Sequence, residues 1–353
     1  MTPSVWLLHE RVVCRSWRAQ LGERPIMFRH VAGLAAVLGL VATTADAQTT
    51  LRLHTLVQSP HPYNDMAEFM AEQIAERSDG AFRIEIFPGA SLGNDPAVIG
   101  EMALGSIDLI VSSTNNAENA VPELAAFSLP YLFTSIDDFM ERAGPGTALE
   151  AHFMERYEAS GSGMRLLALN ASGTRNFSTA RGPVEGLDDI SGARMRVPPS
   201  PLMMQTWEAL GTIPVSVAWA ELYAAVQTGV ADSLESSIPG YVGSKLFEVA
   251  PYLALTAHTL LASHISISEV TWGRLSEEQR ALFLEVADEA TRLGAEMGKV
   301  YDDELVVELQ EQHGVTVTQP DPTPFMERLA PVQDALAAQM GLEAELALIR
   351  AGS

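Results

Sequence analysis

The chain is poor in cysteine and in lysine. Cys14 is its only cysteine, and Lys245 and Lys299 are its only lysines among 353 residues. A single cysteine cannot form a disulfide within the chain, so a stable fold must depend on its hydrophobic core. Because Cys14 lies close to the N-terminus, the rest of the chain has neither a thiolate nucleophile nor a cysteine ligand for a metal.

Positive charge is scarce throughout. The chain has 22 basic and 45 acidic residues. Five of the basic and three of the acidic residues lie in positions 1–47, so the remainder has a net charge of −25. Nucleic acid and anionic membrane surfaces are therefore excluded as partners. The overall negative charge would repel a small anion. Such a ligand would therefore need a local positive pocket, which clustered arginines could form.

Apolar runs long enough for a membrane helix are also missing. The apolar stretch Val31–Ala42 has twelve residues, whereas a helix needs about 20 to cross a bilayer. Basic residues precede it and Ala45-Asp46-Ala47 follows, which is the layout of a secretory signal peptide. We predict cleavage near Ala47 and export to the periplasm, and a second start at Met27 would preserve the same signal. Cys14 precedes the apolar run, so no lipid anchor is expected at the cleavage site.

Signatures of common enzyme classes are absent, with one exception. The chain has no H-E-x-x-H metal motif, no P-loop and no dinucleotide-binding glycine pattern, so we expect no metal and no cofactor. Gly89–Gly93 matches the G-x-S-x-G pattern of serine hydrolases, in which Ser91 would be the nucleophile. In those enzymes a helix starts directly after the serine, but here Asn94 followed by Pro96 predicts a later helix start. A hydrolase is the enzymatic alternative.

Strand-like and helical segments alternate along the chain. The strand patterns are 51–57, 82–87, 108–113 and 164–170, and the helical patterns begin near Tyr63 and at 97–104 and 147–160. This alternation predicts an α/β fold whose helices cover both faces of a sheet. A second run of strands and helices begins after residue 172, so we predict two α/β lobes with the chain crossing between them more than once.

One predicted helix is unusually long. Glu277–Gln312 contains good helix formers and few breakers, which is longer than most globular helices. A helix of about 36 residues reaches about 54 Å, enough to lie across both lobes. His313-Gly314 ends it, a short strand is predicted at 315–318, and an amphipathic helix resumes at Pro322.

Two arginines lie on or beside short predicted strands in the second lobe. Arg175 lies in GTRNF and Arg196 in RMRVPPSP. An arginine on a strand that faces a cleft presents a planar fork of donors that matches a carboxylate, and it stays charged at physiological pH. Arg194 precedes Arg196 by two residues, and we interpret it as a supporting or surface charge. The two arginines suggest an organic-anion site, although the usual place of any one arginine is the solvated surface.

The segment that contains these arginines resembles a known family. After GTRNF and RMRVPPSP come ALGTIPVSVAWAELYAAVQTGVAD and SLES; EIFPGASLGN and FSLPYLF precede them, and KLFEVAPYLALTAHT and WGRLSEEQRALFLEVADEA follow. Together, over Thr49–Val317, they resemble the solute-binding proteins of TRAP transporters, the DctP family. The resemblance implies a two-lobed periplasmic binding protein fold with a hinge and a long helix spanning both lobes. It also implies a receptor, not an enzyme, that delivers an organic acid to a membrane permease and acts as a monomer.

The resemblance further implies lobe boundaries. Lobe I would comprise residues 48–172 and about 258–295, and lobe II residues 173–257 and about 296–353. The ligand would enter the cleft between the lobes, which then close by bending at the hinge.

The resemblance also assigns roles to individual residues. Arg196 corresponds to the family arginine that forms a two-pronged salt bridge with the ligand carboxylate. Arg175 corresponds to a second arginine, which either contacts the ligand, favouring a diacid or a hydroxylated acid, or forms a structural pair with an acid. Trp219 corresponds to an aromatic residue that lines the cleft. Glu235 and Ser236 complete the predicted ligand-binding set, with Ser236 standing where the family usually has asparagine.

The ligand itself stays open. Two arginines and a tryptophan suit C4-dicarboxylates, sugar acids, keto acids and aromatic acids alike, and the shorter side chain of Ser236 widens the choice. A second alternative within the same scaffold is a ligand that is not an acid, such as a zwitterionic osmolyte.

Overall fold

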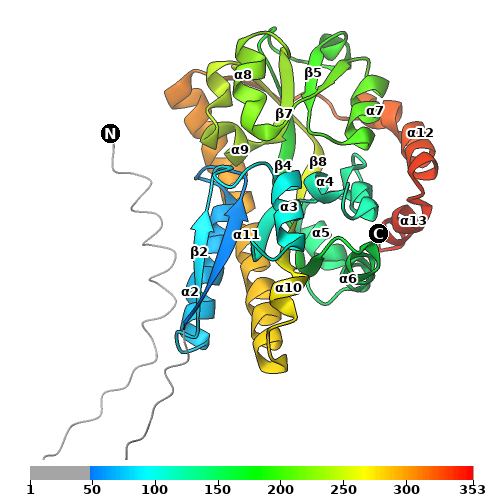
Figure 1. Cartoon of the computed structure of the whole chain (residues 1–353). Helices are drawn as coiled ribbons and strands as arrows, with labels where there is room; N and C mark the ends of the chain where they lie inside the picture. Colours follow the sequence, from blue (N-terminus) through cyan, green and yellow to red (C-terminus); the bar gives the residue numbers. More distant parts are fainter. Residues whose placement is uncertain (1–47, 353) are drawn as a thin grey trace, which may run out of the picture. The chain divides into compact units, whose positions relative to one another are not determined.

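Nine strands in the described part of the chain form one mixed sheet. The computed structural model describes residues 48–352 (Figure 1). The strand order is β2-β1-β3-β8-β4-β7-β5-β6, with β9 paired to β8. The strands are β1 (Thr49–Thr55), β2 (Phe82–Phe87), β3 (Leu109–Ser113), β4 (Met164–Thr179), β5 (Arg194–Val197), β6 (Ile213–Ser216), β7 (Ser233–Ser237), β8 (Tyr252–Ser268) and β9 (Thr316–Thr318).

Helices alternate with these strands, as the sequence pattern predicts. The α-helices are α2 (Pro62–Arg77), α3 (Asp95–Ala103), α4 (Thr114–Ala117), α5 (Ile136–Ala143), α6 (Ala148–Ser160), α7 (Pro201–Ala209), α8 (Leu222–Gln227), α9 (Ile238–Gly243), α10 (Glu269–Trp272), α11 (Glu277–His313), α12 (Thr323–Met340) and α13 (Glu343–Ala351). The described residues also form four 3₁₀ helices, which are η1 (Pro122–Ser128), η2 (Leu187–Ile190), η3 (Trp219–Glu221) and η4 (Leu246–Glu248).

Two groups of parallel strands define two halves of the molecule. In the first half β1 pairs in parallel with β2 and β3, and in the second β5 pairs in parallel with β6 and β7. The long antiparallel strands β4 and β8 pair with each other and run through both halves. Figure 1 shows the group containing β2 in the lower half of the view and the group containing β5 and β7 in the upper half. We call these halves lobe I and lobe II.

The strand β4 differs from the sequence prediction. A strand over 164–170 was expected to lead into a separate element at Arg175, but β4 continues for 16 residues. Its pairing with β8 shifts register between Ala171 and Thr174 and again between Arg175 and Phe177. Gly173 has φ +135°, a conformation that glycine adopts without strain. The chain therefore passes from one lobe to the other through an irregular strand, not through a turn.

The helix α11 matches its predicted extent to within one residue. It begins after Ser276, whose hydroxyl accepts a bond from the Gln279 amide while the Gln279 side chain bonds back to Ser276, and it ends at Gly314 with φ +66°. The helix packs on α2 in lobe I and on α9 in lobe II, and it crosses β4 between them. In Figure 1 it runs from the bottom of the molecule to its upper left. One helix thus supports both lobes.

The core of lobe I lies between this helix, α2 and the sheet. Met66, Met70 and Ile74 of α2, three of the four residues predicted to share its apolar face, are fully buried against Phe283 of α11 and the strands. Phe69, the fourth, is partly buried at the edge of the same cluster. The 3.6-residue period of the sequence therefore identified the buried face of α2 correctly.

Gly298 brings α11 into direct contact with the crossing strand. A Cβ atom at this position would lie 2.5 Å from the carbonyl carbon of Ser172 and 2.8 Å from the backbone nitrogen of Gly173. We expect Gly298→Ala to lower the free energy of unfolding by about 1–3 kcal/mol, because the helix must move away from β4. Gly100→Ala in α3 is the matched control, since a Cβ there meets nothing within 4 Å, and it should stabilise by about 0.5–1 kcal/mol. Urea titration of both variants measures the difference, and equal stabilities would contradict the predicted clash.

The predicted signal peptide, with Cys14, lies outside the described residues. Within residues 48–352, none of the helices combines the length and the apolar character that a membrane span requires.

Candidate ligand-binding site

The candidate site lies where the carboxyl ends of the parallel strands of the two lobes face each other. In α/β sheets this edge is the usual place for ligands. Three contacts join the two edges. His61 Nε2 lies 3.5 Å from Ser237 Oγ, the Ala220 amide donates to Asn94 Oδ1 at 3.4 Å, and the Ser200 hydroxyl donates to Glu118 Oε2 at 3.0 Å. The lobes are therefore in contact around the segments that follow β1, β2, β3, β5 and β6 and at the end of β7.

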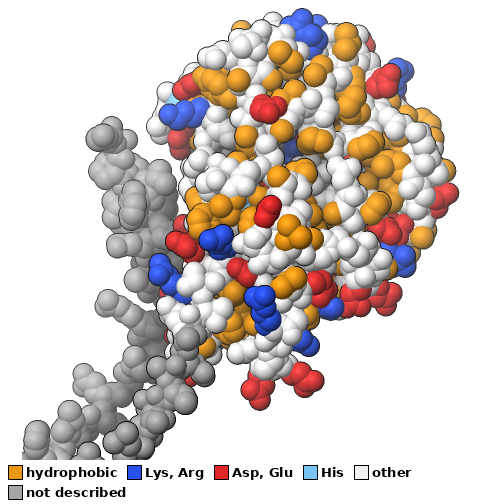
Figure 2. Space-filling model, in the orientation of Figure 1, with side chains coloured by type: hydrophobic (Ala, Val, Ile, Leu, Met, Phe, Trp, Pro, Cys, Tyr) orange, Lys and Arg blue, Asp and Glu red, His pale blue; other side chains and the backbone are white. Residues whose placement is uncertain are grey.

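Arg196 is a buried cation at the end of β5. Its residue is 1% exposed, and its Nε donates to the Val217 carbonyl at 2.8 Å. No other described residue accepts a hydrogen bond from its guanidinium, and no described carboxylate forms an ion pair with it. Burial lowers its pKa to about 10, so it remains charged at neutral pH. In Figure 2 a small basic surface lies recessed among apolar and uncharged side chains in the upper half of the molecule.

Trp219 lies against this cation. The guanidinium carbon of Arg196 is 5.6 Å from the centroid of the Trp219 ring, within the range of a cation–π contact. Trp219 begins η3, and α8 follows directly. A Cβ atom on Gly240 would lie 3.2 Å from the indole ring, so the glycine allows the ring to sit close to the backbone of α9. The predicted pair of Arg196 and Trp219 is thus brought together.

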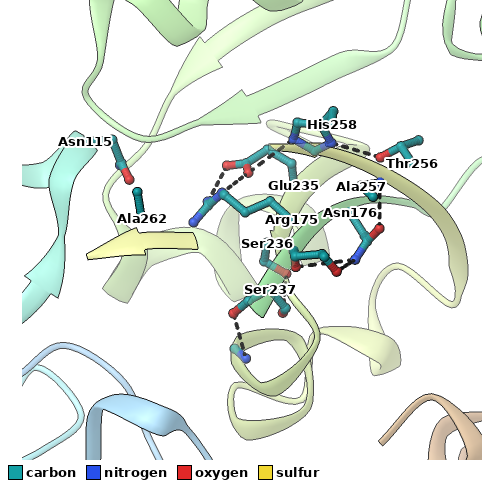
Figure 3. A network of polar contacts seen from close by, with 12 residues as sticks. Asn115, Arg175, Asn176, Glu235, Ser236, Ser237, Thr256, Ala257, His258 and Ala262 are labelled. Atoms are coloured by element: carbon teal, nitrogen blue, oxygen red, sulfur yellow. Dashed lines mark hydrogen bonds and ion pairs between the residues drawn. The ribbon is translucent and has the colours of Figure 1, made fainter. Parts of the chain in front are cut away.

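Arg175 forms a two-pronged ion pair with Glu235. Its Nε lies 2.5 Å from Oε2 and its Nη2 2.7 Å from Oε1 (Figure 3). Strand pairing explains the contact, because Arg175 lies opposite Ser237 and Glu235 shares the strand face of Ser237. Burial alone would raise the pKa of Glu235, but the charge and hydrogen bonds of Arg175 hold it well below the usual range. Arg175 thus pairs with an acid, one of the two roles foreseen for it, and its contact with a ligand stays a prediction.

A histidine that the sequence did not single out completes this pair. His258 Nε2 lies 3.7 Å from Glu235 Oε2, and its Nδ1 lies 2.8 Å from the Thr256 hydroxyl (Figure 3). Trp207 packs edge-on against its ring at a centroid distance of 5.0 Å. Burial lowers the pKa of His258. No local pattern in the sequence marks this histidine, because its role depends on the pairing of β4, β7 and β8.

Ser236 is buried beside the ion pair. Its hydroxyl donates to the Ser237 carbonyl at 3.1 Å. Asn176 lies opposite it on β4 and uses its own amide to bond Thr174 and the Ala257 backbone. The serine hydroxyl is therefore engaged locally in this structure.

Two cavities adjoin the predicted residues. A small one of about 20 Å³ is lined by Arg175 and His258, by Asn115 from lobe I and by Thr206 and Trp207 from α7; about one water molecule fits a space of this size. A larger one of about 250 Å³ has Trp219 as a wall, and its lining is Leu56, Gln58, Gly89, Ala90, Trp219, Ala220, Leu222, Tyr223, Ser244 and Leu246. Both cavities draw residues from both lobes.

Ser91 lacks the local geometry of a hydrolase nucleophile. It is exposed in the turn between β2 and α3, and α3 begins at Asp95 with Asn94 as its N-cap. A strand-to-helix elbow, which those enzymes require, is therefore missing at Ser91.

Glu118 makes the contact between α4 and α7 sensitive to pH. Its carboxyl is buried, with Oε1 unpaired among the described residues, and burial raises its pKa from 4.5 to about 7. The folded protein then holds a proton that the unfolded chain releases, so stability should fall as pH rises from 4.5 to 7, by up to about 3 kcal/mol. Glu118→Gln keeps the Ser200 bond and should flatten this slope. Urea midpoints at pH 5 and pH 8 measure it, and an unchanged slope would rule Glu118 out as its source.

The chain is similar to proteins of a known bacterial family. The family model described as bacterial extracellular solute-binding protein, family 7 (DctP) matches residues 53–340. The sialic acid-binding periplasmic protein SiaP of Vibrio cholerae is 26% identical over 309 residues, covering 87% of this chain and 94% of SiaP. The 2,3-diketo-L-gulonate-binding protein YiaO of Escherichia coli is 26% identical, covering 81% of this chain and 85% of YiaO.

Solved structures give the same result. A TRAP periplasmic solute-binding protein of Polaromonas, bound to D-erythronate, superposes with a TM-score of 0.80 at 25% identity, covering 86% of this chain and 99% of its own. One from Sulfitobacter with bound β-D-galacturonate has a TM-score of 0.79 at 25% identity and the same coverage. The predicted two-lobed α/β fold and the predicted family resemblance are both confirmed.

Proposed function

Because the chain belongs to the bacterial extracellular solute-binding protein family 7, we propose that it binds a small organic acid through the acid's carboxylate. Family members are extracytoplasmic solute receptors, so the chain is a receptor and not an enzyme. Relatives with bound sugar acids support an acid as the ligand. The ligand then passes to the membrane permease of a TRAP transporter.

The buried charge of Arg196 carries this proposal. A cation that loses its hydration without gaining a carboxylate partner is unfavourable, and a ligand carboxylate would supply that partner. Hydrogen bonds to charged groups contribute about 1.5–3 kcal/mol each, and a micromolar receptor needs about 8 kcal/mol in total. Two hydrogen bonds from the unpaired end of the Arg196 guanidinium to the ligand carboxylate, together with packing of the ligand's carbon atoms against Trp219, supply most of this free energy.

The remaining predicted residues support the site from lobe II. The charges of Arg175 and Glu235 lie close enough to Arg196 to shift the pKa of its guanidinium: Glu235 raises it and Arg175 lowers it. Ser236 can turn its hydroxyl from the Ser237 carbonyl to a ligand oxygen at the cost of one local bond.

Opening and closing at a hinge would admit the ligand and return lobe I to the contacts with lobe II that the structure has. We assign residues 48–172 and about 258–295 to lobe I and residues 173–257 and about 296–353 to lobe II. The register shifts in β4 at Ala171–Thr174 support a hinge there, because irregular strands bend at a smaller cost than regular ones. The receptor acts as a monomer in the periplasm after cleavage near Ala47.

A ligand screen tests the proposal. The chain without residues 1–47 would be denatured and refolded to remove carried-over ligand, then heated with dicarboxylates, sugar acids, keto acids, aromatic acids and zwitterionic osmolytes. A ligand at 1,000 times its Kd adds about 4 kcal/mol of stability, which a thermal shift detects. Shifts with acids alone support the carboxylate site. Shifts confined to uncharged or zwitterionic compounds would overturn it.

A further inference from the structure

Among the residues that the structure describes, the charges around the site leave a single cation without a carboxylate partner. Glu235 neutralises Arg175 through two hydrogen bonds, whereas Arg196 has no paired carboxylate among the described residues. The histidines nearby add no charge, because burial lowers the pKa of His61 to about 3 and lowers that of His258 as well. The site can therefore compensate one ligand carboxylate, but within residues 48–352 it holds no second free cation for another.

His61 presents a neutral donor from lobe I with a defined tautomer. Its Nδ1 accepts a hydrogen bond from the Tyr63 amide at 3.2 Å, which caps the N-terminus of α2. A neutral imidazole that accepts at Nδ1 carries its proton on Nε2. Nε2 points across the cleft to Ser237, and the distance of 3.5 Å to its hydroxyl is at the limit of a hydrogen bond. A ligand oxygen placed between the lobes could receive this proton instead.

Tyr63 presents a second neutral donor. Its residue is 3% exposed, and its hydroxyl has no partner in hydrogen-bonding geometry among the described residues. Burial raises the pKa of Tyr63 well above its usual range, whereas the positive charge of Arg175 and the hydroxyls of Ser263 and Ser113, its polar neighbours, lower it. The Tyr63 ring packs edge-on against His61 at 4.4 Å. A buried hydroxyl without a partner is costly, so a ligand oxygen at this position would remove that cost.

We propose that the ligand is a monocarboxylate whose other polar groups are uncharged oxygens, and that Tyr63 and His61 bind one of these oxygens from lobe I. The inference rests on the proposed function and narrows it. Arg196 takes the single carboxylate. The opposite wall offers hydroxyl and imidazole donors, which suit a hydroxyl or carbonyl group. A second carboxylate would approach Glu235 with no cation to balance it, which is unfavourable.

Matched pairs of acids test the charge argument. D-erythronate and meso-tartrate share a four-carbon hydroxylated skeleton, and D-galacturonate and galactarate share a six-carbon one; in each pair only the second acid has two carboxylates. Calorimetric titration of the refolded protein should give a Kd at least about tenfold lower for the monocarboxylate of the preferred length. A diacid that binds as tightly as its partner would overturn the inference and leave the carboxylate site intact. If none of these four acids binds, and no other acid binds either, the proposed function is overturned as well.

Two tyrosine variants test the residue assignment. Tyr63→Phe removes only the hydroxyl and should weaken binding of the preferred monocarboxylate by about tenfold. Tyr157→Phe is the matched control, because Tyr157 is 1% exposed in lobe I and its hydroxyl also lacks a partner, but its pKa is affected by Ser266 and by no arginine. The control should leave Kd unchanged. Equal Kd values for Tyr63→Phe and the wild type would overturn the role of Tyr63.

A third variant separates binding from folding at His61. His61→Asn retains a side-chain acceptor for the cap of α2, where asparagine is favoured, but lacks the Nε2–H group. It should fold with normal thermal stability and weaken monocarboxylate binding several-fold. Unchanged binding in a folded His61→Asn protein would overturn the part of the inference that concerns His61.

Discussion

Replacing Arg196 by alanine will weaken the binding of organic acids by about 30-fold or more. Removing one partner of a buried charge pair costs about 2–5 kcal/mol, and each 1.4 kcal/mol is tenfold in Kd. Arg196→Lys should recover only part of this loss, because an ammonium group cannot reproduce the planar fork of the guanidinium. Calorimetric titration with the acid identified by the thermal screen measures the effect.

The stability of the same variant gives an independent readout. Arg196 is buried without a carboxylate partner among the described residues, so its removal should not destabilise the ligand-free protein and is expected to stabilise it slightly. Loss of binding together with unchanged or higher stability would separate a binding role from a structural one. A large loss of stability would instead show that Arg196 holds the fold together.

Arg194→Ala is the control for Arg196. Arg194 lies on the same strand, but its side chain is 51% exposed and bridges Asp232 at 3.3 Å, as expected of a surface charge. We expect its removal to leave Kd unchanged. If both variants weakened binding equally, net positive charge near β5 would be responsible, and the buried fork of Arg196 would have no special role.

The sequence predicted well those features that depend on local patterns. The C-terminal end of α11 follows from Gly314, and the start of α3 follows from Asn94 and Pro96. These signals lie within a few residues of the helix end that they mark, so short segments contain the necessary information. Arg196 and Trp219 were chosen on family resemblance and not on pattern; the structure places them side by side, and their contact with a ligand stays a prediction.

The features that depend on strand register could not be predicted in this way. The pairing of Arg175 with Glu235 requires that Arg175 lie opposite Ser237 across β4 and β7, and 60 residues separate the two charges. A one-residue slip would have turned the carboxylate to the other face of the sheet. His258 enters the site for the same reason, through the pairing of β8 with β4.

Tyr63 and His61 illustrate a different limit. The sequence indicated a helix starting near Tyr63, and α2 indeed starts at Pro62, but helical periodicity treats an aromatic residue at such a place as part of the core. Both tyrosines have a buried hydroxyl without a partner among the described residues, and only its closeness to Arg175 distinguishes Tyr63 from Tyr157. This closeness to Arg175 depends on how the two lobes lie against each other, and a local sequence pattern does not contain that information.

Replacing Glu235 by alanine will destabilise the protein by about 3–5 kcal/mol. Breaking a buried ion pair from one side leaves an uncompensated charge, which costs about this amount. Glu235 is fully buried and Arg175 nearly so, so water cannot easily replace the lost carboxylate. Urea denaturation at pH 7 measures the change in the free energy of unfolding.

The pH dependence of this effect has a definite sign. Because Arg175 holds the pKa of Glu235 below its ordinary value of 4.5, the folded state binds fewer protons than the unfolded state at acidic pH. The pair's contribution is therefore fully present above pH 4.5 and is lost as the pH falls below it. The wild type should lose stability below pH 4.5 more steeply than Glu235→Gln, and parallel curves would contradict this assignment.

The double variant Arg175→Met with Glu235→Leu shows what the ion pair contributes to binding. Replacing both charges by apolar side chains removes the unpaired cation, so it should restore most of the stability that Glu235→Ala loses. If the pair serves only the fold, this variant will bind acids as the wild type does. We expect instead that its affinity falls, because Arg175 lies close enough to Arg196 to lower its pKa and Glu235 close enough to raise it. The pair thus sets the electrostatic environment in which a single free cation selects a single carboxylate.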